Sequence, residues 1–135
     1  MSVRILLVED DEDDVFFMRR ALRRVPVEIT LDVCNDGQTA LDYLLRQGAY
    51  AERAGEPLPA VVFLDLKLPY LHGLEVLAVI RRTPALADLN VVVLTSSNEL
   101  RDRVRAEQLG ALRYLVKPPT PAMVTDVLAA AGAGK

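Results

Sequence analysis

The chain has 135 residues, of which 51% are hydrophobic and 26% charged, and its formal net charge is −3 at pH 7. That length suits one domain with its own core and is too short for two independent domains. The small net charge gives no bulk electrostatic attraction to nucleic acid or anionic lipid, so we expect neither DNA nor a membrane as a partner.

The cellular compartment is indicated by two features. The single cysteine, Cys34, excludes an internal disulfide framework and fits a reducing environment, where we read it as a small buried hydrophobic residue. No apolar run approaches the roughly 18 to 20 residues that span a bilayer. The start "MSVRILLVEDD" lacks the architecture of a signal peptide because acids follow its apolar run at once. We therefore predict a cytoplasmic protein.

The strand signals, taken in chain order, are five short runs. Three of them, "VRILLV", "AVVFL" and "NVVVL", are nearly continuous in apolar residues, which is typical of strands buried on both faces of a parallel sheet. The run "VEITLDVC" alternates apolar and polar residues and predicts a strand covered on one face only. The predicted strands are residues 3–8, 27–34, 60–64, 90–94 and 112–116.

Each predicted strand is followed by apolar residues at helical spacing. The first helix is stopped by Pro26, and the second ends near Gly48. The fourth carries a thin apolar stripe around Leu100 and should be the most exposed. The fifth begins at Thr120 with Pro121 in its first position.

A strand followed by a helix, repeated five times, predicts an α/β fold: a doubly wound parallel sheet with helices on both faces. Two strand orders that differ in their switch point remain open at this stage. Residues 46–59 exceed the usual connection of about 2 to 6 residues, so they either extend the second helix or form a surface loop. We assign the domain to residues 1–131 and a short flexible tail to residues 132–135, with no output domain.

Polar residues follow four of the predicted strands at the point where each ends. They are Glu9 and Asp10, then Asp65, then Thr95, then Lys117. Because ligands of an open parallel sheet bind outside the carboxyl ends of its strands, we expect these side chains to converge. Each alone has a simpler reading as a polar residue that marks a strand end. Four strand ends that together supply three acids, a hydroxyl and a lysine favour a site.

Three carboxylates this close repel one another by roughly 4 kcal/mol per pair at an effective dielectric constant of about 20, so the site needs cations. Lys117 supplies one charge, and an all-oxygen ligand set without clustered His or Cys favours Mg²⁺ over zinc. A hydroxyl and an ammonium beside a metal-bound carboxylate are the groups that hold a phosphoryl group while a carboxylate attacks phosphorus.

The acidic run "EDDEDD" is divided between two roles. Glu9 and Asp10 end the first strand and belong to the metal site. Asp11 to Asp14 cap and begin the first helix, where carboxylates satisfy free backbone N–H groups and meet the positive end of the helix dipole. Whether Asp11 also belongs to the site is left open by the sequence.

These residues lie in motifs that resemble the receiver domain of two-component response regulators over essentially the whole chain. The matching motifs, in order, are "LLVEDD", "VFLDLKLPYLHG", "VVVLTSS" and "YLVKPPT". The resemblance implies a flavodoxin-like (βα)5 fold with strand order 2-1-3-4-5. It also implies that Asp65 is phosphorylated by the phosphohistidine of a sensor histidine kinase, and that the protein is a signalling domain rather than a classical enzyme.

The resemblance further implies roles for the other site residues. Mg²⁺ is bound by Glu9, Asp10, Asp65 and the main-chain carbonyl of Lys67. Lys117 pairs with the carboxylate of Asp65 and then with a phosphoryl oxygen, which the hydroxyl of Thr95 also binds, while the small Ser96 leaves access open. Tyr114 is the aromatic switch that moves inward with Thr95, with static packing as its simpler reading. Pro118 follows a cis peptide bond.

Some positions depart from the family pattern. His72 stands where the family commonly has Asp, and we read it as a surface loop residue. Lys67 and Ser97 occupy positions that tune autodephosphorylation, so the lifetime of the phosphorylated state is not predicted. The 46–59 segment, "ALDYLLRQGAY" and "LDLKLP" resemble the single-domain response regulators of phytochrome-type kinases, including bacteriophytochromes.

Members of that subgroup often form homodimers through the fourth helix, fifth strand and fifth helix. Here that surface would be offered by Met123, Val127, Leu112 and Tyr114. A monomer with scattered exposed apolar residues is the alternative.

Other functions remain as alternatives. A chemotaxis-type receiver, a phosphorelay intermediate and a degenerate receiver that only binds proteins share the fold. A haloacid-dehalogenase-like phosphatase would need an acid two residues after the nucleophile, where this chain has Lys67. A flavin or dinucleotide site would need a glycine-rich or hydroxyl-rich loop after the first strand, and "EDDEDD" would repel its phosphate.

Overall fold

The computed structural model describes residues 2–133 of the chain and shows one parallel sheet in the order β2-β1-β3-β4-β5. The strands are β1 (Val3–Val8), β2 (Ile29–Cys34), β3 (Val61–Leu64), β4 (Val91–Thr95) and β5 (Arg113–Val116). The helices are α1 (Glu12–Leu22), α2 (Gly37–Leu45), α3 (Gly73–Arg82), α4 (Leu100–Gln108) and α5 (Pro121–Ala130), with a 3₁₀ helix η1 (Gly48–Arg53). The flavodoxin-like fold is confirmed, and the open question of strand order is settled as 2-1-3-4-5.

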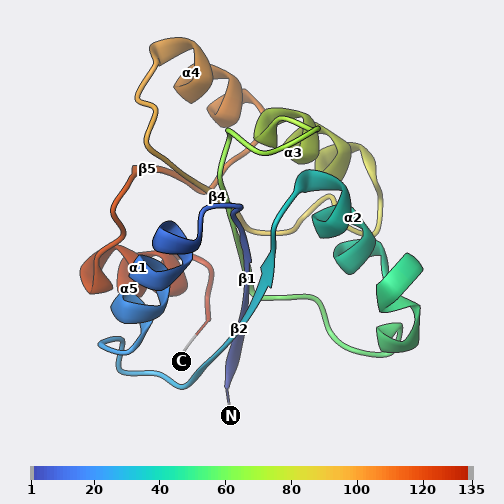
Figure 1. The fold of residues 1–135 in the computed structure, drawn as a ribbon, viewed down its shortest axis with the longest axis horizontal. Helices are drawn as coiled ribbons and strands as arrows, with labels where there is room; N and C mark the ends of the chain where they lie inside the picture. The colour runs from blue at the N-terminus through green and yellow to red at the C-terminus, as the bar shows by residue number, and fades with distance from the viewer. Residues whose placement is uncertain (1, 134–135) are drawn as a thin grey trace.

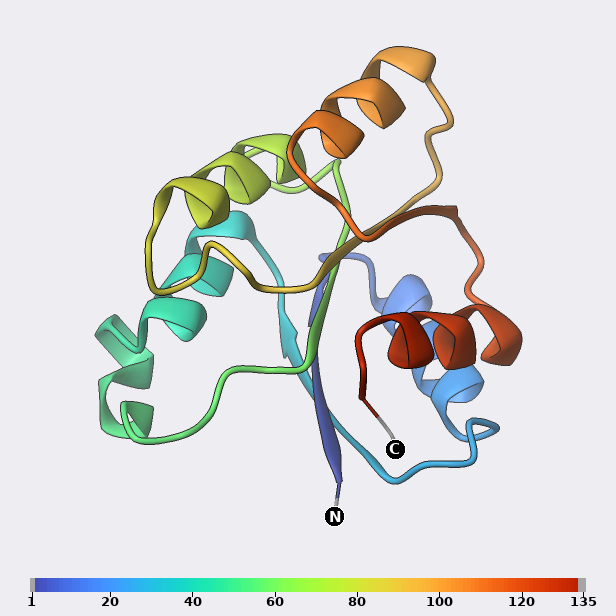
Figure 2. The ribbon, with the colours of Figure 1, turned by 180° about the vertical axis from the view of Figure 1, so that it is seen from behind.

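Helices cover both faces of the sheet (Figures 1 and 2): α1 and α5 lie on one face, and α2 and α3 lie on the other with α4 beside α3. The apolar strands β1, β3 and β4 pack against both layers, as their continuous apolar runs predict. β2 is an edge strand with mostly half-buried residues, which confirms the weaker pattern of its sequence.

Helices α1 and α5 begin directly after residues whose side chains cap them. Asp11 caps α1, and its carboxylate accepts from the N–H groups of Asp13 (2.8 Å) and Asp14 (3.2 Å). Thr120 caps α5, with Pro121 in the first turn. Within the described range of α4, Ala106 alone is buried, so this helix is the most exposed, as expected.

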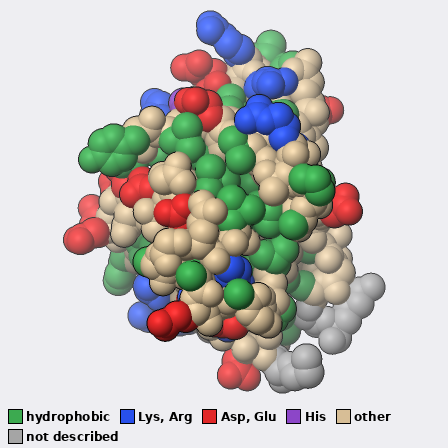
Figure 3. Space-filling model, turned by 90° about the vertical axis from the view of Figure 1, so that its right-hand side faces the viewer, with side chains coloured by type: hydrophobic (Ala, Val, Ile, Leu, Met, Phe, Trp, Pro, Cys, Tyr) green, Lys and Arg blue, Asp and Glu red, His purple; other side chains and the backbone are tan. Residues whose placement is uncertain are grey.

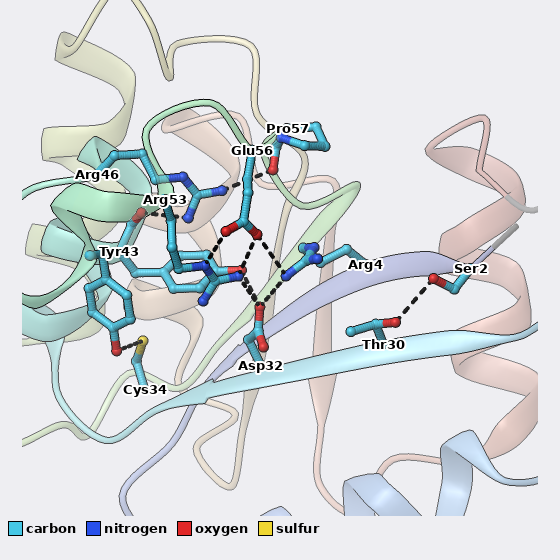
Figure 4. A network of polar contacts seen from close by, with 11 residues as sticks. Ser2, Arg4, Thr30, Asp32, Cys34, Tyr43, Arg46, Arg53, Glu56 and Pro57 are labelled. Carbon is cyan, nitrogen blue, oxygen red and sulfur yellow. Dashed lines mark hydrogen bonds and ion pairs between the residues drawn. The ribbon is translucent and has the colours of Figure 1, made fainter.

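The second helix ends earlier than predicted, because Arg46 rather than Gly48 takes the first left-handed conformation, with φ 53°. Residues 46–59 neither extend α2 nor remain an irregular loop throughout, since η1 forms within them. Figure 4 shows how the segment is tied to the sheet. Arg53 binds Glu56 (2.9 Å) and Asp32 of β2 (3.2 Å).

Asp32 is shared by further partners, because Arg4 of β1 lies 2.9 Å from its carboxylate and the hydroxyl of Tyr43 donates to it. The ring of Tyr43 lies below the guanidinium groups of Arg46 and Arg53. Cys34 is buried beside this network, and burial raises the pKa of its thiol to about 11, which fits the inert role expected for it.

The exposed apolar residues differ from those expected on the surface of α4, β5 and α5. Val127 is fully buried in the core, so its prediction as a surface residue was wrong: it lies on the face of α5 that packs against the sheet. Leu100, Val104 and Val116 are exposed instead. On the side that Figure 3 shows, acidic and basic side chains are scattered around a central band of hydrophobic ones.

None of the helices within residues 2–133 combines the length and hydrophobicity needed to cross a bilayer.

At the C-terminal end of α5, the N–H groups of Gly132 and Ala133 donate to carbonyls of that helix. The rest of the expected tail, 134–135, lies outside the described residues.

The start of α3 lies unusually close to the end of β3. The N–H of Gly73 donates to the carbonyl of Leu66 at 2.8 Å. A Cβ added at Gly73 would lie 2.2 Å from the carbonyl oxygen of Asp65 and 2.7 Å from the Cα of Leu66. Only glycine therefore allows α3 to begin against the residue that follows β3.

We predict that Gly73→Ala lowers the free energy of unfolding by about 2 kcal/mol, because the methyl group displaces main chain rather than a flexible side chain. Urea unfolding followed by circular dichroism measures the change. Gly55→Ala is the matched control, since a Cβ at Gly55 meets nothing within 4 Å, and its stability should stay within about 0.5 kcal/mol of the wild type. Equal stability of Gly73→Ala and the wild type would contradict the close approach.

Candidate functional site

The register of the sheet brings the predicted site residues together at its carboxyl edge. Val8 of β1 pairs with Leu64 of β3, so the residues that follow, Glu9 and Asp65, lie side by side. Thr95 at the end of β4 pairs with Val116 of β5, and Lys117 is the next residue. The convergence expected from the strand ends is therefore present in the structure.

Three carboxylates form the acidic part of the site. Glu9, Asp10 and Asp65 each offer one carboxylate oxygen, and these oxygens lie within 4.8 Å of one another. Glu9 is 2% exposed and Asp65 6% exposed, whereas Asp10 is open to solvent. An all-oxygen set with one solvent-facing side fits a hard divalent cation that keeps part of its hydration, such as Mg²⁺ or Mn²⁺.

Asp65 is held by main-chain and side-chain bonds at once. Its N–H donates to the carbonyl of Val8 at 3.1 Å. Its Oδ1 accepts from the N–H of Leu66 at 2.8 Å, and its Oδ2 accepts from Nζ of Lys117 at 3.1 Å. The carboxylate therefore has a fixed orientation with one oxygen toward the ammonium group.

Lys117 reaches three carboxylates from three different elements. Its Nζ lies 2.6 Å from Oε1 of Glu9, 2.7 Å from Oδ2 of Asp14 and 3.1 Å from Oδ2 of Asp65. Burial lowers the pKa of Lys117, but the carboxylates of Asp14, Glu9 and Asp65 outweigh this effect, so the pKa is raised above its ordinary value. The peptide bond between Lys117 and Pro118 is cis.

Glu9 is the most perturbed acid of the site. Burial raises the pKa of its carboxyl group to about 7, and the charge of Asp65 acts in the same direction. The hydrogen bonds from Lys117 and from the N–H of Asp11 partly oppose the rise. The carboxyl group of Glu9 therefore keeps its proton to a higher pH than an ordinary glutamate does.

Asp14 belongs to the site, and the sequence reasoning missed it because the whole run Asp11 to Asp14 was assigned to the helix start. The carboxylate of Asp11 caps α1, as predicted. Asp14 in addition points toward Lys117, since it lies four residues before the fully buried Met18 and shares its helix face. That spacing is the signal that could have found it.

Thr95, Ser97 and Tyr114 form a chain of contacts between the site and β5. Thr95 is fully buried, and its Oγ1 accepts from the N–H of Ser97 at 3.3 Å. The carbonyl of Ser97 accepts from the hydroxyl of Tyr114 at 2.8 Å. The guanidinium carbon of Arg103 lies 4.9 Å from the centre of the Tyr114 ring. Ser97 thus connects the hydroxyl of Thr95 with the ring of Tyr114.

The loop between β3 and α3 carries the residues that depart from the family pattern. His72 is exposed, as expected, and has a further role that the sequence did not reveal. Its Nδ1 accepts from the N–H of Leu74 at 3.1 Å, while the carboxylate of Glu75 accepts from the N–H of His72 at 3.2 Å, which caps α3. Lys67 also lies in this loop, and its side chain is exposed.

Known proteins of similar sequence match most of the chain. Curated relatives include "Probable methanogenesis regulatory protein FilR2" of Methanothrix harundinacea, 41% identical over 84% of this chain and 71% of the relative. They also include "Response regulator Rcp1" of Synechocystis sp., 37% identical over 84% of this chain and 75% of Rcp1.

Solved structures of similar proteins cover nearly the whole chain. "Bacteriophytochrome response regulator RtBRR" superposes with a TM-score of 0.87 at 42% identity, over 100% of this chain and 81% of that one. The Mn²⁺-bound form of Rcp1 gives a TM-score of 0.82 at 34% identity, over 94% and 92% of the two chains.

A family model described as "Response regulator receiver domain" matches residues 5–129, which include every residue of the acidic cluster and Lys117. Together with the relatives and the shared fold, this match shows that the chain belongs to the response regulator receiver domain family, with phytochrome response regulators among its relatives.

Proposed function

We propose that this chain is a single-domain response regulator of a two-component phosphorelay, which works in the cytoplasm and accepts a phosphoryl group on Asp65 from a sensor histidine kinase. The observation that carries the proposal is the position of the Asp65 carboxylate. It lies 3.1 Å from the ammonium of Lys117 and within 4.8 Å of carboxylate oxygens of Glu9 and Asp10. Phosphoryl transfer needs a nucleophile that lies beside one fixed cation, here the ammonium of Lys117, and beside ligands for a second cation, the metal ion.

Each residue of the site has its own role in the proposed phosphoryl transfer. An oxygen of Asp65 attacks the phosphorus of the phosphohistidine, so a P–O bond forms, the P–N bond breaks and the imidazole leaves with the electron pair. Lys117 then binds a phosphoryl oxygen, and Thr95 donates its hydroxyl to another. Glu9, Asp10, Asp65 and the main-chain carbonyl of Lys67 are the proposed ligands of Mg²⁺, which when bound neutralises charge on the phosphoryl oxygens.

The Mn²⁺-bound structure of the relative Rcp1 supports a divalent cation in this family. The oxygen-only cluster of this chain supports the same choice. This chain has Lys67 two residues after Asp65, where the phosphatase alternative needs an acid. Acids rather than glycines follow β1, where a nucleotide-binding site needs a phosphate loop, so both alternatives lose their chemical basis.

We propose that phosphorylation is read out through Thr95 and Tyr114. If Thr95 moves its hydroxyl to the phosphoryl group, the contact that Thr95 now makes with the N–H of Ser97 is lost. Ser97 also holds the hydroxyl of Tyr114, so both contacts change together. Tyr114 lies on β5 under Arg103 of α4, which is where a partner surface made of α4, β5 and α5 would sense the change.

The partner we favour is a phytochrome-type histidine kinase. Its support is the likeness to two bacteriophytochrome response regulators, RtBRR and AtBRR. The 41% identity to FilR2 keeps a receiver of another pathway, such as a chemotaxis-type receiver or a phosphorelay intermediate, as the second candidate. A homodimer through α4, β5 and α5 completes the proposal, with Leu100, Val104 and Val116 as its exposed apolar residues.

We predict that Asp65→Asn abolishes phosphorylation by a small donor such as phosphoramidate, because the amide cannot form the acyl phosphate. Intact-mass spectrometry with Mg²⁺ should show an added phosphoryl group on the wild type and none on the variant. Asp88→Asn, at an exposed aspartate between α3 and β4, is the control and should be phosphorylated like the wild type. Alkali-labile phosphate on Asp65→Asn would show that the nucleophile is misassigned.

We predict that the affinity for Mg²⁺ rises with pH through about 7 and then levels off. The folded pKa of Glu9 lies above its ordinary value, so below pH 7 a proton occupies this ligand and competes with the metal, by about tenfold per pH unit. Isothermal titration calorimetry between pH 5.5 and 8.5 measures the curve. Glu9→Gln removes the competing proton, so an inflection that persists near pH 7 in that variant would contradict the assignment.

We predict that the wild type forms dimers when Mg²⁺ and beryllofluoride are added, and that Leu100→Asp prevents this. Leu100 is 75% exposed on α4, so its substitution should cost the monomer little while placing charge in the apolar contact. Sedimentation velocity measures the oligomeric state. Leu58→Asp, outside the α4-β5-α5 surface, is the control that should still dimerise, and dimers of Leu100→Asp would exclude this surface.

A further inference from the structure

The ammonium of Lys117 has more carboxylate partners than the proposed chemistry requires. Its closest contacts are to Glu9 at 2.6 Å and to Asp14 at 2.7 Å, while Asp65, the residue that it is expected to serve, is the most distant of the three at 3.1 Å. Asp14 lies outside the cluster of potential metal ligands found among the described residues. Its contact with Lys117 is therefore not explained by metal binding.

The three contacts would respond differently when the site is filled. Glu9 and Asp65 are the proposed metal ligands and phosphoacceptor, so their oxygens become engaged by other partners. Asp14 comes from the first turn of α1 and is not among the proposed ligands, so its carboxylate stays available to Lys117. An incoming phosphoryl group must therefore share the ammonium with Asp14 rather than with Glu9.

The surroundings of Asp14 allow its carboxylate to be hydrated when it loses the contact with Lys117. Asp14 and Lys117 both line a cleft of about 560 Å³ between α1 and the start of α5, whose walls include Phe17, Arg20 and Pro119. The side chain of Asp14 is 29% exposed, against 11% for Lys117. A carboxylate that can be hydrated in this cleft forms a contact of modest strength, like that of a surface ion pair.

We propose that Asp14 is a positioning residue that holds the Lys117 ammonium on the α1 side of the site and competes for it with the phosphoryl group on Asp65. This inference rests on the proposed function. It follows that Asp14 lowers the affinity of the site for a phosphoryl group, because removal of its charge releases Lys117 to the phosphoryl oxygens. Before the phosphoryl group arrives, Glu9 and Asp65 still hold the lysine in place.

The test compares the affinity for beryllofluoride, a phosphoryl mimic, at saturating Mg²⁺ and fixed neutral pH by ¹⁹F NMR. Asp14→Asn should bind it about fivefold more tightly than the wild type, the factor that corresponds to a surface ion pair of the stronger kind. Asp14→Ser, which also lacks the carboxylate, should match Asp14→Asn. Asp14→Glu restores the carboxylate and should stay within about twofold of the wild type.

The control for charge alone is Asp13→Asn, because Asp13 is an exposed residue of the same helical turn. It should bind beryllofluoride within about twofold of the wild type. A merely structural role of Asp14 would weaken binding or leave it unchanged in Asp14→Asn, and either result overturns the inference while wild-type binding upholds the proposed function. If the wild type itself does not bind beryllofluoride with Mg²⁺, the proposed function falls and the inference falls with it.

Discussion

The ion pairs of Lys117 are the interaction on which this site depends. One ammonium group compensates carboxylates from the end of β1, the first turn of α1 and the end of β3, at distances of 2.6 to 3.1 Å. Without it, Glu9 and Asp65 would be two nearly buried acids with carboxylate oxygens within 4.8 Å of one another, and burial already raises the pKa of Glu9 to about 7. The lysine thus compensates the charge of a buried acidic site.

The fold supplies the positions that this interaction needs. β1 and β3 are neighbours in the centre of the sheet, and their register places Glu9 beside Asp65. β4 and β5 place Thr95 and Lys117 at the same edge. Gly73 lets α3 begin directly against the carbonyl of Asp65, which fixes where the loop between β3 and α3 ends. The register of the strands therefore sets where Glu9, Asp65, Thr95 and Lys117 lie.

The sequence predicted the parts of the structure that depend on local patterns. Apolar runs locate the buried strands, and because parallel strands end at one edge, the polar residues after them had to converge near Asp65. Contacts that join distant residues were not predictable in this way. Asp14 looked like one more capping acid, although its helix spacing from Met18 directs it to Lys117. The ion pairs that tie η1 to Asp32 and the burial of Val127 likewise depend on how elements pack, not on the residues within one element.

The most direct test of the account is to locate the phosphoryl group itself. The wild type is incubated with phosphoramidate and Mg²⁺, the acyl phosphate is reduced with borohydride to homoserine, and the modified residue is identified by peptide mass spectrometry. The account predicts homoserine at position 65, formed in a Mg²⁺-dependent manner and absent without the donor. Homoserine at another carboxylate, or modification that is independent of the metal, would contradict it.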